Sequence, residues 1–148
     1  MNAPAKRARK AERPYILDDQ VGFLLRQVAQ RHAAIFAAGI ESDLTTTQWA
    51  ALAKLAEIGP LSQNLLGRHT AMDAATIKGV IDRLTKRGLT ETRPDPEDGR
   101  RLLVALSEAG RALVAHATPQ ALRITDETLA PLTPEERDVL VGLLARLR

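Results

Sequence analysis

The most informative absence in this 148-residue sequence is cysteine. Without a thiol, the chain can form no disulfide, no cysteine-based zinc site, no thiolate nucleophile and no cysteine redox switch. Aromatic residues are also scarce, at 3%, although hydrophobic residues make up 45% of the chain. We therefore expect a core of ordinary size, built mainly from leucine, isoleucine, valine and alanine.

Long apolar runs and enzyme signatures are missing as well. No segment approaches the roughly 20 apolar residues of a membrane span, and the basic N-terminus lacks the apolar part of a signal peptide. The sequence has no Ser-His-Asp spacing, no phosphate-cradling glycine loop and no paired carboxylates in an apolar setting. Its three histidines are dispersed, which is a poor metal signal. We predict a cytoplasmic protein that is not an enzyme and has no metal, cofactor or membrane partner.

Positive charge is concentrated at the N-terminus. The first fourteen residues hold five Lys or Arg against one Glu, although the whole chain carries only +3. They are polar and include two prolines, so we expect a disordered basic tail over residues 1–14. Such a tail either adds salt-sensitive, sequence-blind affinity for nucleic acid or only keeps the protein in solution.

Both flanks of the chain predict amphipathic helices. Apolar residues recur at three- and four-residue spacings from Val21 to Gly39, after an acidic start at Asp18-Asp19. Phe23 lies off this stripe, which indicates a second buried face and therefore a partner. Residues 107–148 predict two more helices, and Pro119 should kink or interrupt the first of them.

The middle of the chain holds a different order of elements. In sequence order, we expect a helix capped at Thr45 and stopped by Gly59-Pro60, a short helix from Ser62 to Arg68, a helix from Asp73 to Gly88, a strand from Leu89 to Arg93, a charged turn from Pro94 to Arg100, and a returning strand from Arg101 to Leu106. Two helices followed by a β-hairpin are typical of a winged helix-turn-helix module that reads DNA.

The helix that begins at Asp73 has an outer face suited to the major groove. Alanines and Thr76 offer methyl groups to thymine, and Lys78 can reach guanine or phosphate. Gly79 costs about 0.5–1 kcal/mol relative to alanine in mid-helix, which indicates close approach of the backbone to something large. A tight helix–helix contact is the alternative. The residues predicted to read DNA are Ala74, Ala75, Thr76, Lys78, Gly79 and Arg83.

The hairpin turn carries arginines that suit a minor groove. Arg100 and Arg101 stand beside an acidic turn, and Asp98 is placed to hold the Arg100 guanidinium by a bidentate pair. The alternative is a solvated hairpin whose charges cancel. Ser62 and Arg68 are predicted contacts to the DNA backbone, and Asp82 and Asp98 are expected to partner arginines.

These residues together resemble the MarR-type winged-helix regulators. The motif positions that match are Leu84, Gly88-Leu89, Arg93, Pro94, Asp95, Asp98, Arg100, Leu106-Ser107 and Gly110. The family usually has Thr where this chain has Ser107, and both residues cap helices. The stretches DDQVGFLLRQ, TQWAAL and AMDAATIKGVIDRL are similar to the subgroup that represses nicotinate-type aromatic catabolism.

The resemblance implies a mainly α fold with one β-hairpin wing, in the order α-α-α-α-β-β-α-α. It implies an N-terminal dimerisation helix over residues 15–44, a winged helix-turn-helix domain over 45–106 and C-terminal dimerisation helices over 107–148. The function it implies is a homodimeric repressor on a pseudo-palindromic double-stranded DNA operator, with half-sites about one helical turn apart. The alternative is a winged-helix protein-interaction module without specific DNA binding.

The resemblance also implies release by a small aromatic carboxylate that binds between the dimer helices and the DNA module. The candidate effector-binding residues are Arg26, His32, Phe36 and Trp49, since Arg26 can neutralise an acid and His32 can bond a ring substituent. The alternatives are that Phe36 and Trp49 are plain core and that His32 is a satisfied core histidine. The missing cysteine excludes the thiol-based, peroxide-sensing branch of the family.

Overall fold

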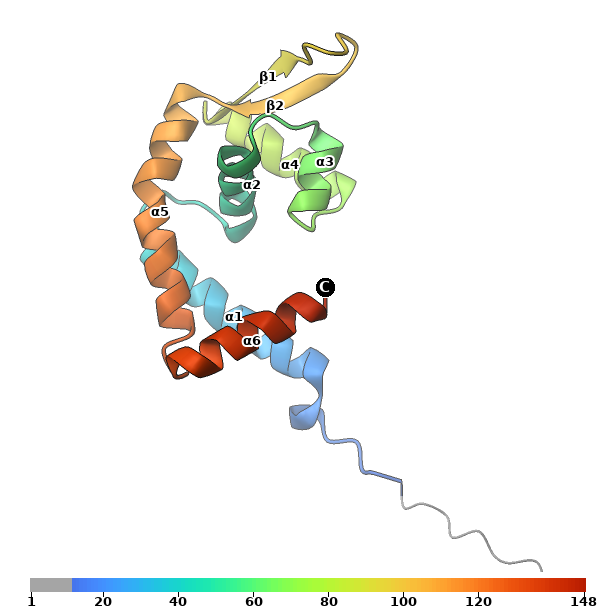
Figure 1. Cartoon of the computed structure of the whole chain (residues 1–148), viewed down its shortest axis with the longest axis vertical. Helices are drawn as coiled ribbons and strands as arrows, with labels where there is room; N and C mark the ends of the chain where they lie inside the picture. The colour runs from blue at the N-terminus through green and yellow to red at the C-terminus, as the bar shows by residue number, and fades with distance from the viewer. Residues whose placement is uncertain (1–11) are drawn as a thin grey trace, which may run out of the picture.

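The computed structural model describes residues 12–148, so residues 1–11 of the predicted basic tail lie outside the described residues. The described residues form six α-helices and one β-hairpin, in the predicted order (Figure 1). After a short 3-10 turn at Leu17–Asp19, the elements are α1 (Val21–Gly39), α2 (Thr46–Ile58), α3 (Gln63–His69), α4 (Ala74–Lys86), β1 (Thr90–Pro94), β2 (Leu102–Leu106), α5 (Glu108–Thr128) and α6 (Pro134–Arg146).

Side-chain caps fix where most helices begin. At α2, the Gln48 backbone N–H donates to Oγ1 of Thr45, and the Thr45 N–H donates back to the Gln48 side chain, both at 3.2 Å. This is the predicted capping box. Ser62, Asp73, Ser107 and Thr133 cap α3, α4, α5 and α6 in the same way, each accepting from the backbone N–H three residues on.

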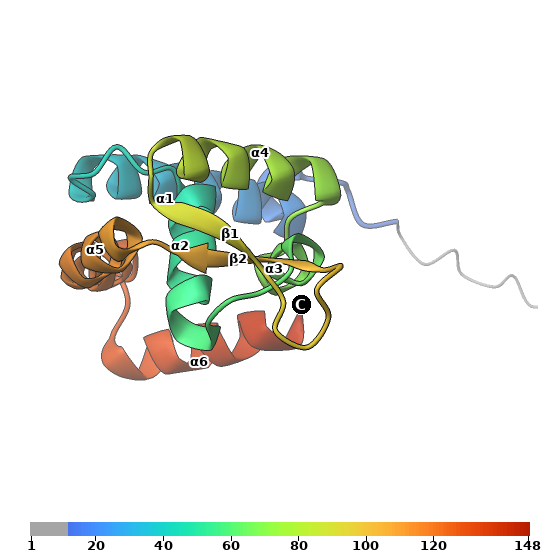
Figure 2. The ribbon, with the colours of Figure 1, turned by 90° about the horizontal axis from the view of Figure 1, so that it is seen from above.

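The molecule has two ends. α2, α3, α4 and the hairpin gather at one end, and α5 runs from the hairpin to the other end, where α6 turns back (Figures 1 and 2). α1 packs along α5. The core lies in the α2–α4 region, where Leu52, Leu66 and Leu84 are fully buried. Phe36 of α1 and Ala117 and Ile124 of α5 belong to the same core, so the helices of the predicted module are held from both sides by the protomer.

A tight joint connects the wing to α5. The Ser107 hydroxyl donates to the Gly88 carbonyl oxygen at 2.6 Å and accepts from the Gly110 N–H at 3.0 Å. A Cβ at Gly110 would collide with the carbonyl oxygen of Leu89. The spacing Leu106-Ser107-x-x-Gly110 therefore has a physical cause, because only glycine lets the first turn of α5 approach the root of the wing so closely.

Two details of the helices differ from expectation. α5 is one continuous helix through Pro119, so of the two expected effects, a kink or an interruption, the interruption is wrong. α1 starts at Val21, and Asp18 and Asp19 belong to the separate 3-10 turn before it. Within residues 12–148, no helix is long and apolar enough to cross a membrane.

The ends of the chain leave large apolar side chains exposed. In α1 these side chains lie in the first two turns, and in α6 they lie along most of the helix. We call these two segments the arms, meaning residues 15–28 and 139–147. Their exposed apolar residues are Tyr15, Ile16, Leu17, Val21, Leu24, Leu25, Val28, Val139, Val141, Leu143, Leu144 and Leu147.

Candidate DNA-reading surface and effector cavity

The start of α4 is fixed by a carboxylate cap. Oδ1 of Asp73 accepts from the backbone N–H of Thr76 at 2.7 Å, and this bond lowers the pKa of the Asp73 carboxyl below its ordinary value. The residue Ala71, in the turn before it, has a φ of 55°, a conformation that non-glycine residues adopt infrequently. The short link between α3 and α4 is therefore tightly shaped, and it sets the angle of α4.

The two faces of α4 have opposite character. Ile77, Val80, Ile81 and Leu84 are buried, as the apolar stripe predicted. Ala74, Ala75, Thr76, Lys78 and Arg83 are exposed, and Gly79 lies between the faces with intermediate exposure. The structure therefore brings the predicted DNA-reading residues together on one accessible side of one helix.

Gly79 is not explained by packing within the protomer. A Cβ built there meets only the guanidinium of Arg83, whose nearest nitrogen is 3.5 Å away, at ordinary van der Waals distance. The helix–helix contact considered as an alternative is absent around this described residue. Close approach of an outside surface to Gly79 stays a prediction.

The partner of Asp82 is not an arginine, so that prediction is wrong. Nζ of Lys78 lies 2.8 Å from the Asp82 carboxylate, one helical turn on. Both side chains are well exposed, and such a surface pair is weak. A phosphate or a base edge can therefore compete with Asp82 for Lys78.

The wing is a two-stranded antiparallel ribbon whose turn is held by backbone bonds. Thr90 pairs with Leu106, and Pro94 pairs with Leu102. Oδ1 of Asp98 accepts from the backbone N–H of Arg100 at 3.1 Å, and the Asp98 carbonyl accepts from the Arg101 N–H at 2.9 Å.

The predicted bidentate pair between Asp98 and the Arg100 guanidinium is therefore wrong. Asp98 instead accepts hydrogen bonds from backbone N–H groups of the turn, as aspartates in turns commonly do. Across residues 12–148, no carboxylate lies within ion-pair distance of the Arg100 guanidinium. The Arg100 side chain is exposed and available to an external anion.

The two predicted backbone contacts lie on α3. The Ser62 hydroxyl caps that helix by accepting from the Leu65 N–H at 3.3 Å, and Arg68 is exposed in its last turn. Arg68 also borders a small hollow, about 220 Å³ in volume, that reaches the first residue of α4 at Ala74. It therefore lies beside the start of the predicted recognition helix.

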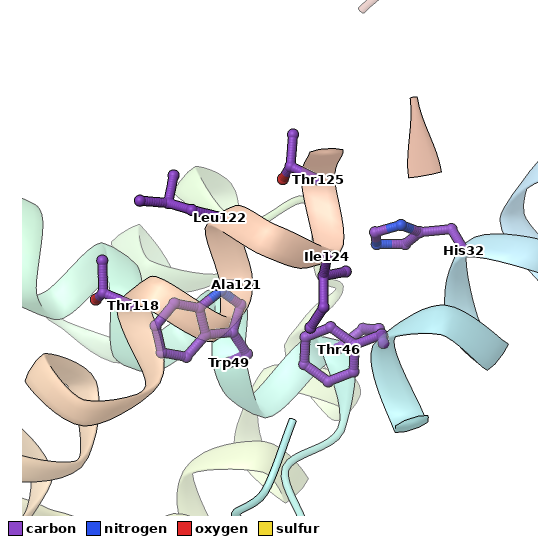
Figure 3. A pocket seen from close by; sticks show the side chains of 9 residues that line it. His32, Thr46, Trp49, Thr118, Ala121, Leu122, Ile124 and Thr125 are labelled. Atoms are coloured by element: carbon purple, nitrogen blue, oxygen red, sulfur yellow. The ribbon is translucent and has the colours of Figure 1, made fainter. Parts of the chain in front are cut away.

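A second feature lies where α1, α2 and α5 meet. A cavity of about 340 Å³ opens there (Figure 3), with a lining of His32, Phe36, Thr46, Trp49, Thr118, Ala121, Leu122, Ile124 and Thr125. Three of the four predicted effector residues are brought together in it. The fourth, Arg26, is exposed on α1 and does not line the cavity.

His32 connects α1 to the end of α5. Its Nδ1 lies 2.9 Å from the Thr128 hydroxyl, and the neighbouring Arg31 guanidinium donates to the Thr128 and Glu127 carbonyl oxygens at 2.6 and 3.1 Å. Helix carbonyls at a C-terminus lack intrahelical partners, and a guanidinium there also complements the helix dipole. One wall of the cavity is therefore held in place by α1.

Six lining residues were not predicted, and five of them come from α5. Thr118, Ala121, Leu122 and Thr125 recur at three- and four-residue spacing, a signal that could have marked one face of α5 in the sequence. Phe36 is 5% exposed and so belongs to the core as well as to the cavity wall. The described residues hold no group of three or more histidine or carboxylate side chains placed to bind a metal ion.

Comparison with known proteins adds independent observations. The sequence profile described as "MarR family" matches residues 42–101. The chain is 40% identical over 135 residues to the HTH-type transcriptional repressor NicR of Pseudomonas putida, covering 90% of this chain and 85% of NicR.

Two solved structures have the same architecture. A probable transcriptional regulator from Pseudomonas aeruginosa is 60% identical, with a TM-score of 0.87, over 90% of this chain and all of that one. BpsR of Bordetella bronchiseptica, studied for the regulation of its DNA binding by 6-hydroxynicotinic acid, is 44% identical, with a TM-score of 0.86, over 90% and 96% of the two chains.

Proposed function

The chain belongs to the MarR family of DNA-binding transcriptional regulators, and on that premise we propose that it is a homodimeric repressor released from its operator by a small aromatic acid. The observation that carries this proposal is the division of α4 into a buried apolar face and an exposed face of small and basic residues. A helix of this kind can enter a major groove while its other face stays in the core. The protein would act in the cytoplasm, where the operator is.

The DNA contacts we propose follow from exposure. Thr76 and Lys78 read base edges from α4, and Gly79 lets the backbone approach. Arg100 enters the neighbouring minor groove from the wing, assisted by Arg101. The remaining proposed contacts are Ala74, Ala75, Arg83 and Asp98 near the bases, and Ser62 and Arg68 on the DNA backbone.

The proposed dimer is supported by the arms. Their large apolar side chains are exposed within residues 12–148, and exposed apolar surface concentrated in this way favours an interaction site. We assign residues 15–44 and 107–148 to dimerisation and residues 45–106 to DNA reading. A two-fold dimer would present two copies of α4 to half-sites about one helical turn apart.

The effector proposal is supported by the cavity. Its volume of about 340 Å³ suits a single-ring acid, and its walls are mostly apolar with a few hydroxyl groups. BpsR, which has the same fold at 44% identity, is regulated in its DNA binding by 6-hydroxynicotinic acid. Because α1, α2 and α5 all line this cavity, an acid bound there would bias how α1 and α5 hold the DNA-reading helices, with a coupling of about 1–3 kcal/mol.

A gel-shift titration tests both parts of the proposal. The full chain is titrated onto the DNA upstream of its own gene, at two salt concentrations, with and without 6-hydroxynicotinic acid. We expect a specific shift that weakens with salt and is reversed by the acid. Absence of any specific shift would favour a protein-interaction module, and a shift that the acid does not affect would overturn the effector assignment alone.

The cavity residues are tested by a matched pair of variants. Trp49→Ala should abolish both the thermal stabilisation by the acid and the release of DNA. Thr125→Val removes the hydroxyl of an exposed lining residue with little change of shape. It should fold normally, so it still tests the cavity if the Trp49 variant misfolds. If the acid stabilises both variants as much as the wild type, the effector binds elsewhere.

A further inference from the structure

The chemistry of the cavity depends on one imidazole. Among the lining residues, all of which the structure describes, His32 is the only titratable one. Its ring projects toward the other lining side chains in Figure 3. A neutral imidazole has one N–H donor and one bare acceptor nitrogen, and the bond made by one nitrogen decides the role of the other. The partner of Nδ1 therefore determines whether Nε2 of His32 offers an effector a hydrogen-bond donor or an acceptor.

That partner is the Thr128 hydroxyl, and its own geometry assigns the proton. Oγ1 of Thr128 lies 2.8 Å from the Ile124 carbonyl oxygen and 2.9 Å from Nδ1 of His32. Two oxygens at 2.8 Å repel unless a proton lies between them, and a carbonyl has none to give. The single hydroxyl proton must point at Ile124, so Nδ1 of His32 must donate to Thr128. The neutral ring then keeps Nε2 as a bare acceptor.

One further contact holds this arrangement in place. The Arg31 guanidinium binds the Thr128 carbonyl oxygen at 2.6 Å, so the turn that carries the hydroxyl is tied to the same helix as His32. Thr128 does not line the cavity. It acts through His32, as a positioning residue.

We propose that His32 selects aromatic acids that carry a hydrogen-bond donor on the ring, a hydroxyl or an N–H, over the same acids without it. This rests on the proposed function, because it concerns the effector of the same cavity. A carboxylate can only accept hydrogen bonds, so the bare Nε2 of a neutral ring offers it none. We therefore place the carboxylate at the other polar groups of the cavity.

Two of those groups are suited to it. The hydroxyls of Thr46 and Thr125 line the cavity. The third lining threonine, Thr118, directs its proton to the Val114 carbonyl at 2.7 Å. The cavity thus has an acceptor on α1 and donors on α2 and α5. An acid that carries both a carboxylate and a ring donor can use both kinds of group.

Calorimetric titration of the full-length protein tests the selection with two pairs of acids. The pairs are 6-hydroxynicotinic with nicotinic acid, and 4-hydroxybenzoic with benzoic acid. We expect the hydroxylated acid of each pair to bind about tenfold tighter, the effect of one buried hydrogen bond. Thr128→Val removes the hydroxyl with little change of shape and should reduce this ratio toward one, whereas Thr128→Ser should preserve it.

A measurement without ligand tests the cause. Nitrogen-15 NMR distinguishes the two imidazole tautomers, and the His32 signals are assigned by their loss in His32→Gln. We expect the proton on Nδ1 in the wild type and in Thr128→Ser, and a shift toward the Nε2–H form in Thr128→Val. A wild-type ring protonated at Nε2 when neutral would overturn the inference.

The outcomes separate this inference from the proposed function. If both acids of a pair bind equally, the selection by His32 is wrong and the effector assignment stands. If neither acid of either pair binds the wild type, the effector assignment itself is wrong and the selection falls with it.

Discussion

Helices α4 and α6 have the same length, 13 residues, but they differ in how far their side chains are buried. α4 buries four apolar side chains against α2 and α3, whereas α6 has no buried residue. Both helices have well-defined N-caps, so the difference does not lie in how they begin. It lies in what covers their apolar faces, since one is covered by its own chain and the other is not.

The comparison separates two kinds of stability in one molecule. The proposed DNA-reading domain, residues 45–106, which we call the reader, has its apolar side chains buried in a core completed within the protomer by α1 and α5. The arms carry apolar side chains that the folded protomer leaves exposed. We infer that the reader's stability belongs to the protomer and that the arms' stability belongs to the proposed dimer, so the two should respond differently to the same kind of substitution.

The largest effect is expected from charges placed on the arms. Val28→Asp combined with Leu144→Asp should convert the dimer to a monomer at micromolar concentration, because each uncompensated charge buried at an interface costs roughly 3–5 kcal/mol. Sedimentation velocity measures the change. Ile58→Asp is the matched control, since Ile58 is similarly exposed but lies on α2, and it should leave the oligomeric state unchanged.

A cavity in the reader should act on the protomer instead. Leu52→Ala empties a fully buried site and should lower the free energy of unfolding by about 2–5 kcal/mol. Urea unfolding measures it, with Leu147→Ala on the exposed end of the chain as the control. A larger loss from Leu147→Ala than from Leu52→Ala, in dilute protein, would contradict the division into closed reader and open arms.

Removal of the wing arginine should affect DNA and leave folding alone. Arg100→Ala is expected to weaken operator binding by about 1–3 kcal/mol and to relax the A·T preference beside each half-site. The unfolding midpoint and the oligomeric state should not change. Arg93→Ala is a suitable control, because Arg93 lies on β1 of the same hairpin and is partnered by Glu91. Unchanged affinity of Arg100→Ala at physiological salt would remove the wing from the DNA contact.

Gly79→Ala should move stability and function in opposite directions. Alanine relieves the helix cost of glycine, so the protein should gain about 0.5–1 kcal/mol in its free energy of unfolding. The added methyl would face the DNA, since it meets nothing but the Arg83 side chain in the protomer. Operator affinity should fall in the same variant. A stabilised variant with full affinity would show that no surface approaches Gly79.

The smallest effect concerns the cap of α4 and depends on pH. The pKa of Asp73 is lowered from 3.8 by its bond to the Thr76 N–H, so the carboxylate favours folding at pH values above that ordinary value. This contribution is lost as pH falls through the lowered pKa. Asp73→Asn should therefore melt slightly below the wild type at pH 7, and the two melting temperatures should converge at acidic pH.

The features that could be predicted from the sequence are those fixed by neighbours along the chain. The caps at Thr45 and Asp73, the stripe of α4 and the order of the elements depend on residues three or four positions apart. The partners of Asp82 and Asp98 could not be predicted, because each carboxylate had several local competitors. Lys78 lies one helical turn from Asp82 and pairs with it. The backbone N–H of Arg100 in the hairpin turn is close to Asp98 and donates to its carboxylate.

The full lining of the cavity could not be predicted from the periodicity of apolar residues along the chain. His32, Phe36 and Trp49 were identified because they are rare residue types near the junction of two helices. The α5 wall lies 69 to 93 residues further on, and its threonines are ordinary surface residues until the fold places them in the same cavity as His32. Arg26 was expected for its charge, but it lies nearly two turns before His32 on α1 and does not line the cavity.

The joint at Ser107 has a consequence for anyone who wishes to graft this reader onto another protein. A cut between Leu106 and Ser107 follows the apparent boundary in the sequence, yet it would sever the hydroxyl that ties the Gly88 carbonyl to the first turn of α5. A chimera should keep the wing and the first turns of α5 from one parent. The splice point then belongs further along α5, beyond the residues that touch the wing.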